Sequence, residues 1–167
     1  MLIYQTTKKQ FTEHVTLNQI ETEVLSRFQE RLGHTTSQKE IDSWRNSLVF
    51  MEKALELANI PDDAGIAIEF CIPMTAKRVD FLISGFDHEG NTNVVIVEMK
   101  QWQEVGITHK DAIVETRLGG AWRETTHPSY QAWSYAQLLR DFNEHVYNGG
   151  IRLFPCVYLH NLSLIHI

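Results

Sequence analysis

The sequence is poor in cysteine and has no long apolar run. Its two cysteines, Cys71 and Cys156, are too few and too far apart for a zinc-binding spacing or a disulfide framework. The first residues, MLIYQTTKKQF, lack the apolar core of an export signal. No apolar stretch approaches the roughly 20 residues of a membrane span. We therefore expect a cytoplasmic protein with reduced thiols and no membrane-spanning segment.

The sequence also lacks the excess of positive charge that is typical of proteins that coat nucleic acid. Its 15 Lys and Arg residues stand against 21 Asp and Glu residues, which gives a formal net charge of −6. This balance argues against binding nucleic acid by bulk charge alone. It is compatible with a nuclease, because a metal site needs carboxylates. With 43% apolar residues in a chain of 167, we expect a single packed domain.

The order of helical and strand patterns predicts an α/β fold. Three segments place apolar residues at helical spacing: 17–32, 37–58 and 129–143. Four segments bounded by turn residues and rich in apolar or β-branched residues predict strands: 65–73, 78–86, 93–102 and 153–161. A hairpin is expected within 107–126, whereas residues 1–16 show no clear period. This order predicts a mixed central sheet flanked by helices.

Two charged residues end the most apolar of these strands. Glu98 and Lys100 are two positions apart, so their side chains point to the same face. A Glu-x-Lys pair alone is more often the place where a strand emerges into water. Asp80 changes this interpretation, because an aspartate within an apolar strand is costly unless it is paired or metal-bound. The alternative for Asp80 is an ion pair with Arg78 or Lys77.

Adjacent strands of a hairpin can bring Asp80 beside Glu98. Two carboxylates on one face repel each other, and a divalent cation relieves that repulsion. Mg²⁺ or Mn²⁺ suits such hard oxygen ligands. Together with Lys100, these residues resemble the signature of the PD-(D/E)XK nuclease superfamily, with Val79 where the motif has proline.

The segment 129–143 carries a second motif. Gln131 and Tyr135 are four residues apart and share one face of the expected helix. This pair resembles the Q-x-x-x-Y motif of RecB-like nucleases, in which the helix follows the Glu-x-Lys strand, as it does here. Alone, the pair also suits an amphipathic helix with Tyr135 in the core. Both motifs in the expected order favour the nuclease-like interpretation.

A larger part of the chain, roughly 37–161, resembles one group of bacterial proteins. In that group a nuclease-like domain precedes a Schlafen-like P-loop helicase. The matching stretches are 43–48, 78–80, 97–102, 127–131 and 158–161. The resemblance implies an α/β/α, restriction-endonuclease-like fold and a C-terminal helicase as partner.

The resemblance also sets the expected domain limits. We expect residues 1–161 to be one nuclease-like domain, the N-terminal part of a longer protein. The final residues, 162–167 (LSLIHI), do not continue the family pattern. They are expected to be a non-native tail from a sequencing adapter.

The expected function is metal-dependent hydrolysis of phosphodiester bonds in nucleic acid, with DNA as the expected substrate. Asp80, Glu98 and the carbonyl of Met99 would hold the metal, which polarises the phosphate and acidifies a bound water. Lys100 would act as a cation rather than as a base. The alternative function is a non-catalytic module on the same fold, which binds nucleic acid or braces the helicase.

Gln131 and Tyr135 would position the metal shell or the nucleic-acid backbone. Other residues have two interpretations each. Glu40 is either an extra acidic site residue or part of a solvated helix face, and Glu69 either faces the site or pairs with a basic residue. His127 either contacts phosphate or caps a helix. Gln101 either bonds near the metal or meets solvent, and the four tryptophans are expected to pack in or beside the core.

Overall fold

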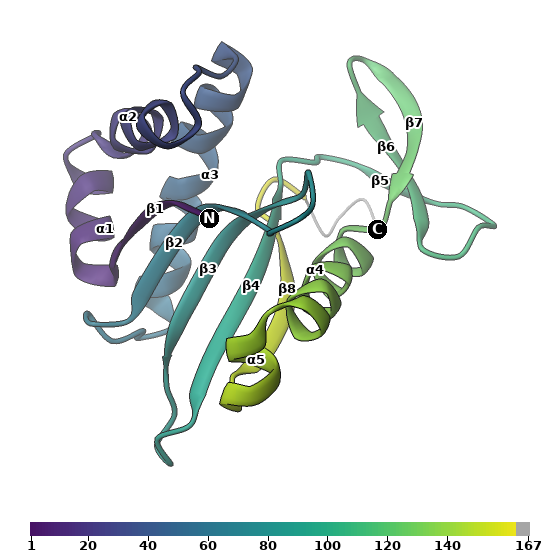
Figure 1. The fold of residues 1–167 in the computed structure, drawn as a ribbon. Helices are drawn as coiled ribbons and strands as arrows, with labels where there is room; N and C mark the ends of the chain where they lie inside the picture. Colours follow the sequence, from purple (N-terminus) through teal and green to yellow (C-terminus); the bar gives the residue numbers. More distant parts are fainter. Residues whose placement is uncertain (163–167) are drawn as a thin grey trace.

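The computed structural model describes residues 1–162 (Figure 1). Its strands form a five-stranded central sheet in the order β1-β2-β3-β4-β8 and a separate three-stranded sheet in the order β5-β6-β7. The elements are β1 (Leu2–Thr7), α1 (Lys8–Thr16), α2 (Ile20–Leu32), α3 (Gln38–Leu57), β2 (Gly65–Cys71), β3 (Arg78–Phe86), β4 (Thr92–Lys100), β5 (Val105–Ile107), β6 (Ile113–Leu118), β7 (Ala121–Thr126), α4 (Pro128–Phe142), α5 (Glu144–Gly149) and β8 (Arg152–Leu159). The expected α/β fold with a mixed central sheet is confirmed.

The central sheet is mixed because its last strand runs parallel to its neighbour. Strands β1 to β4 pair antiparallel, and β8 pairs parallel with β4. The return from β4 to β8 passes through the small sheet and α4, since a parallel pair needs a long connection. This connection places α4 against the strand that carries Glu98 and Lys100.

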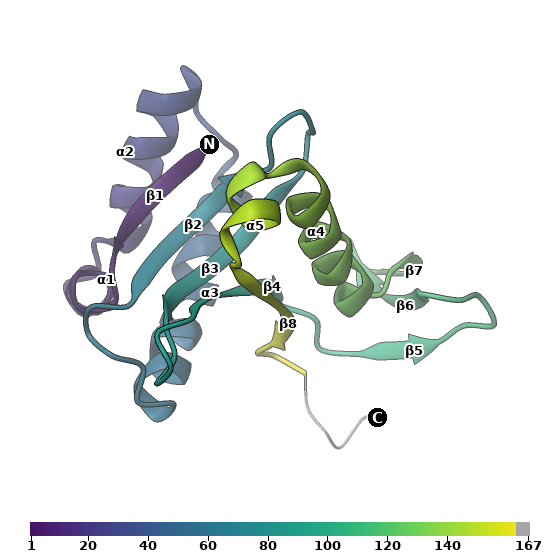
Figure 2. The same ribbon diagram turned by 60° about the horizontal axis from the view of Figure 1, so that its bottom comes forward.

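Helices cover both faces of the central sheet (Figures 1 and 2). Helices α1, α2 and α3 share one core with the sheet, in which Phe11 and Phe81 meet edge to face at 5.4 Å between ring centroids. Helix α4 forms the opposite core, where Ala136 and Leu139 pack with Ile96 of β4. The alternation of apolar residues along β3 and β4 supplies both cores at once.

The N-terminal residues form regular structure that the sequence did not predict. Residues 1–16 contain β1, which pairs antiparallel with β2, and α1. Ile3 and Tyr4 are fully buried, and Phe11 and Val15 bury one side of α1. A six-residue edge strand and a nine-residue helix contain too few periods of apolar residues to be detected in the sequence. The short helix α5 was not predicted for the same reason.

Helix ends follow local chemistry. Ser37 caps α3 by accepting a hydrogen bond from the Glu40 N–H, and Gly33 ends α2 with φ of 72°. Helix α2 begins at Ile20, three residues later than expected, since Leu17 instead caps α1.

In the described part of the chain, no helix is long and apolar enough to cross a membrane. The expected adapter tail falls mostly on 163–167, outside the described residues.

The small sheet, β5–β7, is called the arm from here on. Its β6–β7 hairpin matches the expected one, and its turn places Gly119 and Gly120 at φ of 62° and 85°. Strand β5 adds a third strand that the sequence did not predict. Both ribbon views show the arm extending away from the helices and the central sheet (Figures 1 and 2).

Candidate functional site

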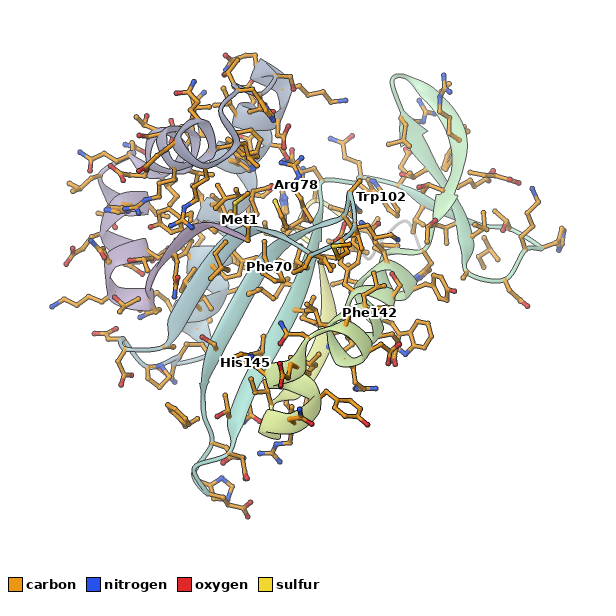
Figure 3. The ribbon with its side chains drawn as sticks, viewed as in Figure 1. Met1, Phe70, Arg78, Trp102, Phe142 and His145 are labelled. Carbon is orange, nitrogen blue, oxygen red and sulfur yellow. The ribbon has the colours of Figure 1, made fainter. Side chains whose placement is uncertain are left out.

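A cleft of about 1070 Å³ opens at the end of the central sheet where β3 begins and β4 ends. Its walls come from α3, from the ends of β2, β3 and β4, and from the turn of the arm. Arg78 and Trp102, labelled in Figure 3, mark this end of the sheet. The polar and charged side chains that line it include Glu40, Glu69, Arg78, Asp80, Lys100 and Gln101.

Asp80 lines this cleft, and the buried Glu98 contacts Lys100, which also lines it. Pairing of β3 with β4 sets Phe81 opposite Val97, so Asp80 and Glu98 are the next residues along the two strands. The two carboxyl groups lie close enough for the charge of Asp80 to raise the pKa of Glu98. Asp80 Oδ2 also accepts a hydrogen bond of 2.8 Å from the backbone N–H of Met99. Asp80 and Glu98 therefore lie near each other at the same end of the sheet.

The two oxygens of Glu98 have different surroundings. Oε1 contacts the Lys100 ammonium and accepts a hydrogen bond of 2.6 Å from Gln131 Nε2. Oε2 is buried and has no hydrogen-bond partner within the described residues. The side chain is 1% exposed. An acceptor left unpaired at this depth is costly, so a proton or a cation is the expected complement.

Burial and mutual repulsion make both carboxylates hold protons more tightly. Burial, and then the charge of Asp80, raises the pKa of Glu98 to about 7, although Lys100 opposes the rise. Burial also raises the pKa of Asp80, against the Met99 N–H and the Lys100 charge. Two carboxyl groups in this state favour either a shared proton or a bound cation.

Helix α4 reaches the site through the two residues of its motif. Gln131 Nε2 donates both to Glu98 and, at 2.7 Å, to the Tyr135 hydroxyl. Tyr135 is 6% exposed and its ring lies 5.6 Å from the Lys77 ammonium. Burial, followed by the charge of Glu98, raises the pKa of Tyr135. Tyr135 thus lines the cleft, and Gln131 contacts Glu98.

Arg78 does not pair with Asp80, which was the alternative interpretation of that aspartate. Its Nη2 donates to Glu40 Oε1 at 2.7 Å, and its Nη1 lies 3.0 Å from Glu69 Oε2. The second contact is an ion pair without a well-aligned hydrogen bond between Nη1 and the carboxylate. The guanidinium also lies 5.5 Å from the centre of the Phe28 ring. Glu40 therefore lines the cleft and pairs with Arg78, with its side chain 27% exposed.

Glu69 occupies an unusual backbone position in the middle of β2. Its φ is 55°, which a non-glycine residue in a strand rarely adopts. Its buried carboxylate accepts a hydrogen bond of 2.8 Å from Trp44 Nε1. Burial raises its pKa to about 7, with the Arg78 charge opposing the rise. Glu69 thus pairs with a basic residue and also lines the cleft, so both of its expected interpretations hold.

The other candidates divide between local and site roles. His127 caps α4 by accepting a hydrogen bond of 3.1 Å from the Ser129 N–H. Gln101 Nε2 donates to the hydroxyls of Ser43 and Ser47 on α3, both at 2.9 Å. Gln101 therefore fixes the end of β4 to α3.

The tryptophans do not behave alike. Trp44 and Trp102 are buried, as expected. Trp122 and Trp133 are each 47% exposed, so packing does not explain them. Sequence reasoning also missed that the turn of the arm lines the cleft, through Arg117, Leu118 and Gly119. Exposed glycine and arginine in a hairpin give no sequence signal for the direction in which the turn points.

The donor set at the site consists of two carboxylates. Within residues 1–162 no group of three or more His, Cys, Asp or Glu side chains is arranged to hold a metal ion. Asp80 and Glu98 supply oxygen donors, and Met99 lies beside them and donates its N–H to Asp80.

Comparisons of the chain with protein-family models, with curated proteins and with solved structures gave no match.

Proposed function

We propose that this chain is a metal-dependent nuclease domain of the PD-(D/E)XK type that hydrolyses phosphodiester bonds in DNA. The observation that carries the proposal is the placement of the buried carboxylates Asp80 and Glu98 near each other at the cleft end of the sheet. Lys100 contacts Glu98 Oε1, and the buried Oε2 has no partner among the described residues. Acidic pairs with an adjacent cation at a sheet end suit hydrolysis of an anionic ester.

The residues present fit a magnesium ion. Mg²⁺ commonly uses one or two carboxylates and keeps several waters, so two carboxylates are enough protein ligands. Asp80 and Glu98 would hold it, with the Met99 carbonyl as a third donor. The ion would satisfy Glu98 Oε2 and neutralise the two adjacent charges. When bound, it would polarise the scissile phosphate and lower the pKa of a water.

The remaining residues act on charge and position. The Lys100 side chain is 24% exposed and contacts Glu98, so its ammonium stands between the buried acid and the cleft. There it can stabilise negative charge that develops on the phosphate. Gln131 fixes the orientation of Glu98, and Tyr135 fixes Gln131 through its hydroxyl. Both are positioning residues in this proposal.

A second candidate is a non-catalytic module that binds nucleic acid or braces a helicase. It is favoured by the ion pair of Lys100 with Glu98, which neutralises one carboxylate without any metal, and by the net charge of −6. The resemblance to domains that precede a Schlafen-like helicase adds the proposal of a helicase partner to either candidate. That partner would supply the affinity for DNA that the acidic chain lacks.

Cleavage of labelled single-stranded and duplex DNA tests the proposal. Assays contain Mg²⁺, Mn²⁺ or EDTA, with wild type, Glu98→Gln and Glu89→Gln prepared in parallel. Glu98→Gln keeps the shape but removes a charged ligand, so activity should fall about 100-fold or more. Glu89 is an exposed residue in the β3–β4 turn and serves as the matched control.

The outcomes separate the candidates. Metal-dependent cleavage that is lost only in Glu98→Gln supports the nuclease. Equal cleavage by wild type and Glu98→Gln would place the activity elsewhere or in a contaminant. Binding of DNA without cleavage under every metal condition would favour the non-catalytic module.

A further inference from the structure

The arm is an insertion between the two motifs of the candidate site. The chain leaves the site strand after Lys100, forms β5, β6 and β7, and returns directly into α4. The arm strands make their extensive contacts with one another and not with the helices or the central sheet. Figures 1 and 2 show it standing clear of the main body from two directions. It therefore adds little to the core that holds the domain together.

The arm exposes large apolar side chains that are not buried in either core. Ile107 is 97% exposed, Trp122 47% and Leu118 38%. Large exposed apolar side chains gathered on a small element mark a binding surface more often than chance exposure. The exposed apolar side chains alone would suit either a protein or a nucleic acid as the bound partner.

The charge at the tip favours nucleic acid. Between Thr116 and Arg123 the sequence TRLGGAWR contains two arginines and no acidic residue, in a chain whose net charge is −6. Arg117 lies across the hairpin from Trp122, with its guanidinium 5.7 Å from the ring centre. The same guanidinium pairs with Glu104 at 2.9 Å, in a contact between exposed side chains that a phosphate would replace. Arg123 pairs across from Thr116, on the other face of the hairpin, and has no ion-pair partner among the described residues.

The turn of the arm also belongs to the cleft that Asp80 lines. Arg117, Leu118 and Gly119 line the same cleft as Asp80 and Lys100. A polyanionic strand whose phosphate reaches Lys100 would therefore pass the tip. Lys39 and Lys77 line the cleft as well, so cations border it on the body side and on the arm side.

We propose that the tip of the arm, residues 116–123, binds an unpaired nucleic-acid strand, stacking a base on Trp122 and contacting phosphates through Arg117 and Arg123. The class of ligand rests on the proposed function. A half-exposed indole offers its face to a base only when that base is not stacked in a duplex, so the arm selects single strands. Arginine beside the ring adds a cation that tolerates any base.

Binding is measured without cleavage, so that the inference is tested apart from the chemistry. The probe is a fluorescein-labelled oligothymidine of about 20 nucleotides, followed by anisotropy in EDTA at low salt. Trp122→Ala is expected to weaken binding on the order of tenfold, from loss of one stacked base. Trp133→Ala is the matched control, because Trp133 is equally exposed but lies on α4 and not on the arm.

Two further variants keep the result interpretable if Trp122→Ala disturbs the hairpin. Trp122→Phe retains an aromatic face and should keep most of the affinity. Arg123→Gln removes one phosphate contact, so the slope of log affinity against log salt should fall by about 0.7. Both leave the pairing of β6 with β7 in place.

Several results would overturn the inference. These are an absence of oligothymidine binding by wild type, equal weakening by Trp122→Ala and Trp133→Ala, and a duplex that binds wild type more tightly than the single strand. A protein partner that binds the arm while the oligonucleotide does not would also overturn it. Loss of cleavage in Glu98→Gln with unchanged oligonucleotide binding bears on the proposed function alone, so the two failures are distinguishable.

Discussion

Gln131 on α4 donates a hydrogen bond of 2.6 Å to Oε1 of Glu98 on β4, although 33 positions separate the two residues. The same amide nitrogen donates to the Tyr135 hydroxyl at 2.7 Å. An amide NH₂ has two hydrogens, so both are used. The helix motif and the strand motif are thereby joined in one hydrogen-bonded chain, which ends at the buried carboxylate of Glu98.

Gln131→Ala should impair cleavage more than folding. The change removes the only neutral donor on Glu98 Oε1 seen among the described residues, which frees the carboxylate to reorient. We expect kcat to fall about 10- to 100-fold, with a loss of about 1 kcal/mol in the free energy of unfolding. Gln137→Ala is the control, because Gln137 on the same helix accepts an exposed hydrogen bond of 3.3 Å from Arg140. Equal kcat in both variants would contradict a positioning role.

Tyr135→Phe should act on the site only through Gln131. It removes the hydroxyl that accepts from Gln131, at an expected cost of about 1 kcal/mol in urea denaturation. In a Gln131→Ala background the same change should cost close to nothing, because the partner is already absent. Tyr130→Phe, whose side chain is half-exposed, controls for the loss of a hydroxyl. Additive costs in the double variant would show that the two residues are independent.

Glu69→Gln should stabilise the protein increasingly as pH rises. Burial raises the folded pKa of Glu69 from 4.5 to about 7, so the folded state binds its proton more tightly than the unfolded state. The penalty of ionising Glu69 is absent below the unfolded pKa, grows between the two pKa values and is complete above the folded one. Glutamine stays neutral and avoids it. The stability difference between variant and wild type should therefore rise by about 3 kcal/mol across that interval.

Urea denaturation at about pH 5 and about pH 8 measures this change. Any constant effect of placing an amide beside Arg78 cancels in the comparison. Glu30→Gln removes the same charge from the exposed surface of α2 and is the control. A stability difference that stays flat between the two pH values would show that Glu69 ionises as readily in the folded state as in the unfolded one.

Phe81→Ala should destabilise the domain strongly, because Phe81 is fully buried between β3 and the α1–α3 layer. We expect a loss of about 3–5 kcal/mol in the free energy of unfolding. Phe86→Ala at the other end of the same strand is the control, since Phe86 is 78% exposed and should change stability by about 0.5 kcal/mol or less. Comparable losses in the two variants would contradict the placement of the core.

Local patterns were enough to predict most of the elements. The strand over 78–86 and the helix over 129–143 match β3 and α4 closely, because each contains several periods of apolar residues. The even spacing of Glu98 and Lys100 and the four-residue spacing of Gln131 and Tyr135 also predicted which side chains share a face. Those spacings are geometric properties of a strand and of a helix, so they hold before the elements pack.

Three features depended on contacts between distant segments, and the sequence alone did not reveal them. Arg78 turned to Glu69 and Glu40 rather than to its near neighbour Asp80, since α3 and β2 bring those two carboxylates to it. The positive φ of Glu69 follows from that packing and has no sequence signature. The turn of the arm lines the cleft, although the arm extends away from the main body, because both of its ends are fixed at the site, by β4 and by α4. Sequence determined the elements and the faces on which the acidic and amide side chains lie, because periodicity is local. Only the tertiary structure decided which charged side chains form ion pairs and which residues line the cleft. Both depend on distances between segments that are far apart in the sequence.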